Sequence, residues 1–217
     1  GAYGVKGHTY PDEMATAAIS MILKRPVKFI ADRLESFLTD LHARDHRATA
    51  RAAFAADGEL LGIEMDDLTG VGAYSMYPRT SALEALQVIN YVGAPYMHQN
   101  YKARSRVVFQ NKTPMSQYRA VGHPVAVAIT ETLMDEGARA LDMDPVDIRR
   151  RNLMPDDGYP CEFITGLKME GLSHEASLDK LLTMFDYKGF RAEQAELREK
   201  GIYRGIGFAT LVEMTNP

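Results

Sequence analysis

Two short segments hold the residues whose types and spacing suit the binding of an anionic group. Residues 1–7 read GAYGVKG, and glycines let a backbone approach an anion closely with its N–H groups facing it. Residues 117–124 read QYRAVGHP and precede a long helical pattern, whose first N–H groups also suit an anion. Within this segment Arg119 could hold an oxyanion by two parallel hydrogen bonds. On spacing alone, a simple turn and a structural ion-pairing arginine remain the alternatives.

The other reactive side chains favour structural roles. Neither segment matches a Walker loop or a dinucleotide-binding loop, which need GxxxxGK[ST] or GxGxxG. His123 is interpreted as a loop histidine, and the histidines at positions 8, 42, 46, 98 and 174 show no metal-ligand spacing. Ser116 and Cys161 lie in no recognisable nucleophile motif. We expect three carboxylates of the long helical pattern on a solvated face: Glu131, Asp135 and Glu136.

The composition indicates a globular protein with no nucleic-acid partner. The 217 residues are 46% hydrophobic and carry a net charge of −4, which gives no general attraction to nucleic acid. The basic runs at 102–106 and 149–151 are expected to form a strand edge and a solvated helix face. A single cysteine excludes an intrachain disulfide, and no run of 18 apolar residues predicts a membrane span. A cytoplasmic location is expected, and both ends are typical of a piece of a longer chain.

The order of helical and strand patterns predicts an α+β fold with a mixed sheet rather than a regular βαβ sheet. Helices are expected between Thr9, as N-cap, and Pro26, and over 32–38, 81–91, 124–141, 145–152, 173–186 and 188–200. A hairpin over 46–66 turns at Asp57-Gly58, a strand covers 99–110, and buried strands cover 27–31 and 203–213. We expect a core at 1–153, a loop or linker at 154–172, and a helical extension at 173–217 that leads into the first strand of a next domain.

Six segments, in order along nearly the whole chain, resemble the molybdopterin-binding large subunit of the xanthine dehydrogenase, aldehyde oxidase and carbon monoxide dehydrogenase family of molybdenum hydroxylases. The family's glycine-rich loop GGxFGxK is similar to GAYGVK, with Tyr3 at the Phe position. Its following helix and R-x-E segment resemble YPDEMATAA and RPVKFIADRLESF. Its R-x-H strand, hairpin and GAY turn resemble ARDHRATARAAFAADGELLGIEMDDLTGVGAY. Its active-site loop N-x-x-P…YRGxGxP, its LGxDPxExRxxN segment and its G…RGxG strand resemble NKTPMSQYRAVGHP, LDMDPVDIRRRNLM and KGIYRGIGFA.

The resemblance implies an internal fragment of an oxidoreductase that hydroxylates or oxidises a small aldehyde or N-heterocycle, with water as the oxygen source. The implied cofactor is molybdenum–molybdopterin, often in its cytosine dinucleotide form. The implied partners are an iron–sulfur small subunit with [2Fe–2S] clusters, an FAD medium subunit and the remainder of the large subunit. The fragment alone is expected to be inactive, since the family's general-base Glu lies in a G-x-G-E motif that does not occur here.

The resemblance also implies roles for residues of the two segments. Tyr3 and Gly4 would offer backbone N–H groups near the molybdenum's oxo ligand, Arg119 and Ala120 would approach the metal site from the other loop, and Val121 would stand beside the substrate. Ala120 stands where carbon monoxide oxidisers carry Cys and most other members carry Gly. Gly7 stands where purine oxidisers carry Glu. Neither carbon monoxide nor a purine is therefore the expected substrate.

The sequence is also compatible with two other functions. One is a non-catalytic binding or scaffold domain, a diverged or truncated homologue of the family. The other is a complete small enzyme that uses Arg119 and Glu131 unaided, although no nucleophile, base or metal set is evident in the sequence.

Overall fold

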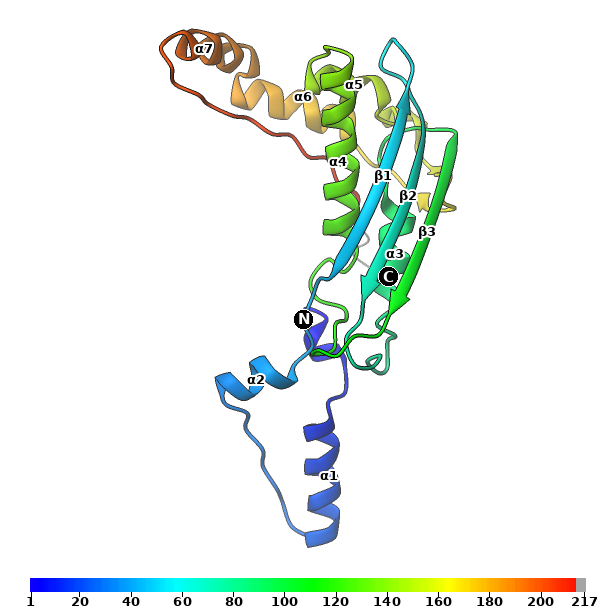
Figure 1. The fold of residues 1–217 in the computed structure, drawn as a ribbon, viewed down its shortest axis with the longest axis vertical. Coiled ribbons are helices and arrows are strands. Elements are labelled where there is room, and N and C mark those ends of the chain that lie inside the picture. Colours follow the sequence, from blue (N-terminus) through cyan, green and yellow to red (C-terminus); the bar gives the residue numbers. More distant parts are fainter. Residues whose placement is uncertain (214–217) are drawn as a thin grey trace. The chain divides into compact units, whose positions relative to one another are not determined.

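The computed structural model describes residues 1–213, and the last four residues of the predicted extension lie outside them. Over these residues the α+β fold with a mixed sheet is confirmed (Figure 1). The main sheet has the order β1-β2-β3, formed by β1 (His46–Phe54), β2 (Leu60–Gly70) and β3 (Asn100–Val108). A small antiparallel pair joins β4 (Cys161–Glu162) to β5 (Lys168–Met169). The helices are α1 (Pro11–Leu23), α2 (Arg33–Thr39), α3 (Leu83–Tyr91), α4 (His123–Ala140), α5 (Pro145–Asn152), α6 (His174–Phe185) and α7 (Tyr187–Glu199).

The main sheet combines a hairpin with a crossover connection. The Asp57-Gly58 turn joins β1 to β2 as the sequence predicts: Gly58 takes a φ of 85°, and the N–H of Ala55 donates to the carbonyl of Glu59 at 2.8 Å. α3 then connects β2 to β3, and Figure 1 shows these two strands pointing the same way. A parallel pair needs such a crossover, so both strand orientations occur in one sheet.

The chain packs into two compact units, each built from separate segments. Unit 1 comprises Gly1–Thr49, Met65–Ile89 and Ala103–Ala126, and unit 2 comprises Ala50–Glu64, Asn90–Lys102 and Val127–Pro217. The three-part division into 1–153, 154–172 and 173–217 stays a prediction.

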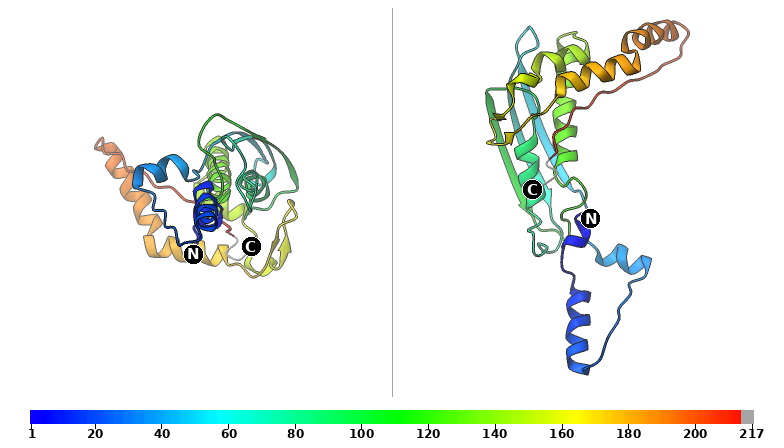
Figure 2. Two further views of the ribbon diagram at one scale, coloured as in Figure 1. Left: turned by 90° about the horizontal axis from the view of Figure 1, so that it is seen from below. Right: turned by 180° about the vertical axis from the view of Figure 1, so that it is seen from behind.

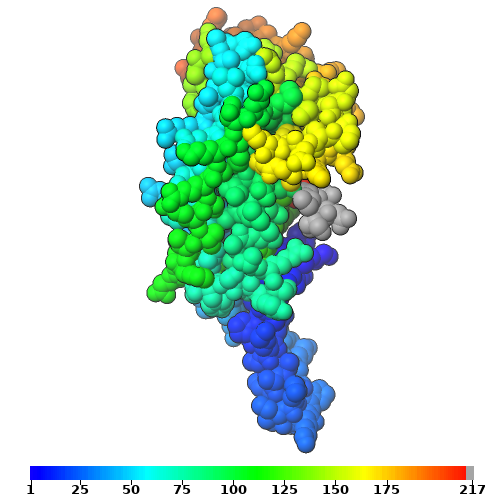
Figure 3. Space-filling model, turned by 90° about the vertical axis from the view of Figure 1, so that its right-hand side faces the viewer, coloured from blue at the N-terminus to red at the C-terminus, as the bar shows by residue number. Residues whose placement is uncertain are grey.

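In unit 1, α1 and α2 form an arm. Asp32 caps α2 with a capping box, as expected, whereas the N-cap of α1 is Tyr10 and not Thr9, because the Glu13 carboxylate accepts from the Tyr10 N–H at 3.0 Å. The buried strand predicted for 27–31 is wrong. This stretch is extended but pairs with no strand among the described residues, and Ile30 is 70% exposed. Figure 3 shows the atoms of α1 and α2 in blue.

In unit 2, the chain returns from α7 as an extended segment. Figure 2 shows it running back along α6 and α7 toward α4. The buried strand predicted for 203–213 is wrong, because no neighbouring strand pairs with it in the described part of the chain. Side chains hold its backbone instead: Gln194 donates to the carbonyl of Arg204 at 2.6 Å, and Arg149 to that of Phe208 at 3.2 Å. Only alternate residues from Ile206 to Val212 face inward.

Candidate cofactor-binding site

The two segments that the sequence singles out meet in unit 1. The N–H of Arg119 donates to the carbonyl of Tyr3 at 3.0 Å, and the Arg119 guanidinium carbon lies 5.9 Å from the centre of the Tyr3 ring. Gly4 lies so close to Gln117 that a Cβ on it would stand 2.3 Å from the Gln117 carbonyl oxygen. A glycine at position 4 is therefore a requirement of packing, and the two segments form one surface.

Both segments are held in an unusual backbone conformation. Tyr3 has a φ of 50° and Gly4 one of 82°, while Ala120 and Val121 have φ of 65° and 41°. Positive φ at a β-branched residue such as Val121 is rare, and each such residue costs on the order of 1–3 kcal/mol. A conformation of this kind persists only where the surroundings fix it.

The conformation leaves backbone donors available. Within residues 1–213, the N–H groups of Tyr3, Gly4 and Ala120 donate to no acceptor, whereas those of Lys6 and Gly7 donate to the carbonyls of Ala2 and Gly4. Successive N–H groups in a turn form a concave surface that binds anions. Where residues 3–4 meet residues 119–121, the two segments thus present these three donors and the exposed guanidinium of Arg119.

Arg44 also contacts the segment 117–124. Its Nε donates to the carbonyl of Val121 at 2.8 Å, and its Nη2 donates to the carbonyls of Tyr118 and Arg119. The sequence indicates no role for this arginine beyond the R-x-H pattern of the family that it resembles. Its position directly before β1 is the signal that could have drawn attention to it.

A buried polar cluster lies behind Arg44. The Glu84 carboxylate is 3.0 Å from Nε of Arg44, and Nδ1 of His46 is 3.1 Å from the Asp67 carboxylate. Burial raises the pKa of Glu84 to about 7, although His46 and Arg44 oppose this rise. The alternation of β2 places Asp67 on the inward face together with Ile63 and Met65, so this cluster could have been found from the strand pattern.

His123 marks the start of α4 and does not lie in a loop. Its Nδ1 is 2.7 Å from the carbonyl of Ala120, and its side chain is buried. The correction follows from the turn at 120–122, which brings the helix start one residue earlier than Pro124. No cluster of three or more His, Cys, Asp or Glu side chains suited to a metal occurs in the part of the chain described.

Glu131 and Arg149 form a buried ion pair in unit 2, which corrects the expectation of two solvated faces. Nε of Arg149 donates to Glu131 at 2.8 Å, and the two residues are 1% and 6% exposed. The Tyr96 hydroxyl donates to the same carboxylate at 2.8 Å. Arg149 lies three residues after Val146 and shares its buried face of α5. Glu136, Arg150 and Arg151 are exposed as expected. Asp135 is partly exposed and also pairs with the buried Arg149, at 2.8 Å.

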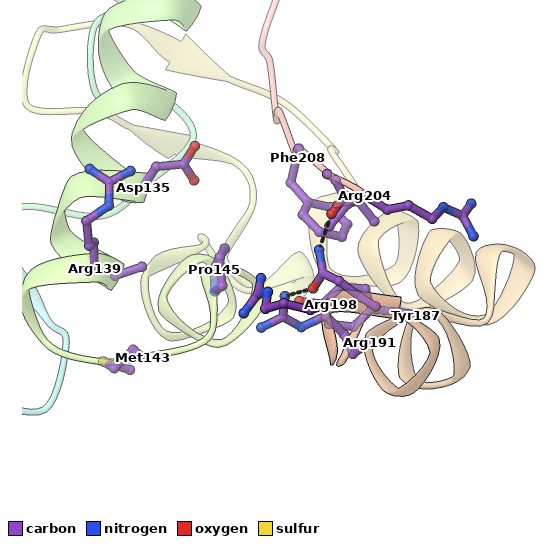
Figure 4. Close-up of a pocket in the computed structure, with 14 residues that line it drawn as sticks. Asp135, Arg139, Met143, Pro145, Tyr187, Arg191, Arg198, Arg204 and Phe208 are labelled. Atoms are coloured by element: carbon purple, nitrogen blue, oxygen red, sulfur yellow. Dashed lines mark hydrogen bonds between the residues drawn. The ribbon is translucent and has the colours of Figure 1, made fainter. Parts of the chain in front are cut away.

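Unit 2 also has a depression of about 410 Å³ with several arginines, shown in Figure 4. Arg204 and Phe208 on the returning segment lie there beside Tyr187 and Arg191 of α7. Glutamates already pair with two of these arginines, Glu136 with Arg139 and Glu193 with Arg204, and Gln194 accepts from Arg191. These pairs stabilise the returning segment, and Arg198 also lines the depression.

A family model described as the molybdopterin cofactor-binding domain matches residues 1–153. The chain belongs to this family, and its resemblance to molybdenum hydroxylase large subunits is confirmed. The nicotine 6-hydroxylase large subunit of Paenarthrobacter nicotinovorans is 34% identical over 98% of the chain, and the carbon monoxide dehydrogenase large chain of Hydrogenophaga pseudoflava is 28% identical over 99%. Among residues 1–213, the structure contains no helix with the length and apolar character of a membrane span.

The fold agrees with solved structures of similar proteins. Quinoline 2-oxidoreductase from Pseudomonas putida 86 matches 93% of the chain with a TM-score of 0.83 and 34% identity. The chain spans only about a quarter of the length of these relatives: 26% of the nicotine 6-hydroxylase subunit, 27% of the carbon monoxide dehydrogenase chain and 26% of the quinoline 2-oxidoreductase chain.

The two segments fit the cofactor for which the family is described. A molybdopterin carries anionic oxygens, and the free N–H groups of Tyr3, Gly4 and Ala120 are suitable donors for them. The close approach of Gly4 to the Gln117 backbone, which brings the two segments together, would be lost with any side chain at position 4.

Proposed function

We propose that the chain forms part of the molybdopterin-binding large subunit of an oxidoreductase that hydroxylates or oxidises a small N-heterocycle or aldehyde, with water as the oxygen source. The observation that carries the proposal is the junction of residues 3–4 with residues 119–121, where three backbone N–H groups lack an acceptor within residues 1–213. The match to the molybdopterin cofactor-binding domain supports the assignment of these donors to that cofactor.

The roles of the site residues follow from what each presents. The N–H groups of Tyr3, Gly4 and Ala120 donate to anionic oxygens of the cofactor, where fixed dipoles act without reorganisation. Arg119 adds a positive charge at the rim, held over the Tyr3 ring. Val121, next to Ala120, borders the substrate. When bound, the molybdenum–pterin supplies the redox chemistry, and the protein supplies position and electrostatics.

An N-heterocycle is the favoured substrate class. Two relatives at 34% identity are named for nicotine and for quinoline. Gly7 does not supply the carboxylate that the family's purine oxidisers carry after the first loop, and Ala120 has no thiol of the kind that carbon monoxide oxidisers carry.

The complete enzyme needs parts beyond this chain. The general-base glutamate of the family comes from the remainder of the large subunit, and [2Fe–2S] clusters and FAD come from partner subunits or domains in a cytoplasmic complex. One relative, 26% identical, is named as subunit gamma of a dehydrogenase complex, which supports a partnership of this kind. We also propose a cytosine dinucleotide form of the pterin.

The proposal is tested by turnover of the intact native complex with a panel of N-heterocycles, aldehydes and purines in ¹⁸O-labelled water. We expect oxidation of an N-heterocycle with one labelled oxygen atom in the product. Turnover of a purine in preference would contradict the substrate class. No turnover of any substrate by a complex that contains molybdenum would favour the non-catalytic scaffold function.

A further inference from the structure

Arg44 binds three carbonyl groups of the segment that carries Ala120 and Val121. Its Nε donates a hydrogen bond to the Val121 carbonyl, and its Nη2 donates to the carbonyls of Tyr118 and Arg119. Its guanidinium carbon also lies 6.0 Å from the centre of the Tyr118 ring. One side chain therefore fixes three of the four peptide groups between residues 118 and 122.

The direction of each carbonyl determines the direction of the next N–H. In a trans peptide the C=O and the following N–H point in opposite directions within one plane. With the Tyr118 carbonyl turned to Arg44, the Arg119 N–H points to the Tyr3 carbonyl, 3.0 Å away. With the Arg119 carbonyl turned to Arg44, the N–H of Ala120 points away from Arg44, and it meets no acceptor among residues 1–213.

The same contacts explain how two consecutive residues keep positive φ. Ala120 and Val121 have φ of 65° and 41°, and without support they would relax to ordinary conformations. The hydrogen bonds from Arg44 reach carbonyls before and after Ala120. Directly after Val121, the Gln87 side chain accepts from the N–H of Gly122 at 3.2 Å. Relaxation of either residue would break at least one of these bonds.

Arg44 is itself held by a buried carboxylate. Glu84 lies on α3, 3.0 Å from Nε of Arg44, and its side chain is 4% exposed. The charged groups that act on Glu84 are Arg44, His46 and Asp67. Because Nε of Arg44 donates to Val121, the contact with Glu84 is an ion pair when Glu84 is ionised, and it restricts the position of the guanidinium.

We propose that Arg44, held by Glu84, is a positioning residue that turns the N–H of Ala120 toward the cofactor. The inference rests on the proposed function, since that function makes Ala120 part of the cofactor site. Arg44 touches neither cofactor nor substrate in this account; it acts through the backbone of residues 118–121.

The test uses the full-length subunit in its native complex. Arg44→Ala removes all three hydrogen bonds. Arg44→Lys keeps the positive charge, but an ammonium group lacks the planar set of donors with which the guanidinium reaches all three carbonyls. Arg104→Ala is the matched control, because Arg104 lies in unit 1 on β3, is exposed, and pairs with Asp66. The readouts are amide hydrogen exchange of residues 117–123, molybdenum content, and the electron paramagnetic resonance spectrum per molybdenum atom.

We expect exchange in residues 117–123 to rise ~10-fold or more in Arg44→Ala, with an altered resonance spectrum in the molecules that retain molybdenum. Arg44→Lys should give a smaller change of both, and Arg104→Ala none. Unchanged exchange and an unchanged spectrum per molybdenum atom in Arg44→Ala would overturn the inference. Absence of molybdenum from the wild-type complex would instead overturn the proposed function.

Discussion

The N–H of Arg119 donates to the carbonyl of Tyr3 at 3.0 Å, and this single hydrogen bond joins the two segments of the site. The bond uses the backbone of Arg119, so the side chain is available for another role. The guanidinium is exposed and lies over the Tyr3 ring. Backbone and side chain of this residue can therefore be tested separately.

Replacing Arg119 by Ala should reduce activity far more than stability. The exposed side chain contributes a cation–π contact of about 0.5–1 kcal/mol, so the melting temperature of the full-length subunit should change by only a few degrees. Turnover and molybdenum content should fall substantially, because the rim of the site loses its positive charge. Equal losses of stability and activity would mean that Arg119 is only structural.

Replacing Gly4 by Ala should disrupt the junction of the two segments. The new Cβ would stand 2.3 Å from the Gln117 carbonyl oxygen at a φ of 82°, and the combined clash and strain should destabilise the subunit by roughly 2–4 kcal/mol. Gly7→Ala is the matched control, since its Cβ would lie 3.9 Å from its nearest neighbour. Thermal melting of both variants measures the difference, and equal melting temperatures would contradict the packing described.

Removing one partner of the Glu131–Arg149 pair should be more damaging than removing both. A single change such as Arg149→Met leaves the buried Glu131 charge without compensation and should cost about 3–5 kcal/mol, whereas the double change Glu131→Leu with Arg149→Met should cost less. Arg150→Ala, on the same helix but exposed and paired with Asp179, is the control. A strictly additive double mutant, measured by melting, would argue against the buried pair.

The sequence predicted the elements of the fold better than their pairing. Local signals such as the Asp57-Gly58 turn and the Asp32 cap act within a few residues, so they can be recognised without knowledge of the fold. The extended conformation of residues 203–213 was also predictable from their strand-like apolar run. Its lack of a strand neighbour was not, because the groups that bind its backbone, Gln194 and Arg149, depend on how the helices pack.

The site shows the same division. Tyr3, Gly4 and Arg119 could be singled out because glycine and arginine patterns carry a recognisable chemistry. The place of Arg44 directly before β1 could have drawn attention to it, but its contacts with Val121 and Glu84 could not be predicted, since these residues are far away in the chain. The burial of Arg149 was missed because a run of three arginines resembles a solvated face, although its spacing from Val146 indicates the inner face of α5.

The stability of the subunit should depend on pH through Glu84. Its pKa is raised from 4.5 to about 7 in the folded state, so the folded state binds the proton more tightly than the unfolded state. This contribution is fully present below pH 4.5 and is lost as the pH rises through about 7. Between pH 5 and 8 the wild-type melting temperature should fall relative to that of Glu84→Gln. A difference that stays constant over this range would show that Glu84 does not titrate there.

The most direct test of the account is the molybdenum content of the intact native complex that contains this chain, purified with its partner subunits. We predict about one molybdenum atom per copy of the chain, as the one-site arrangement of its two segments requires, together with iron from the partner clusters. An intact, folded complex without molybdenum would contradict the central claim and leave the donors of Tyr3, Gly4 and Ala120 without their proposed ligand.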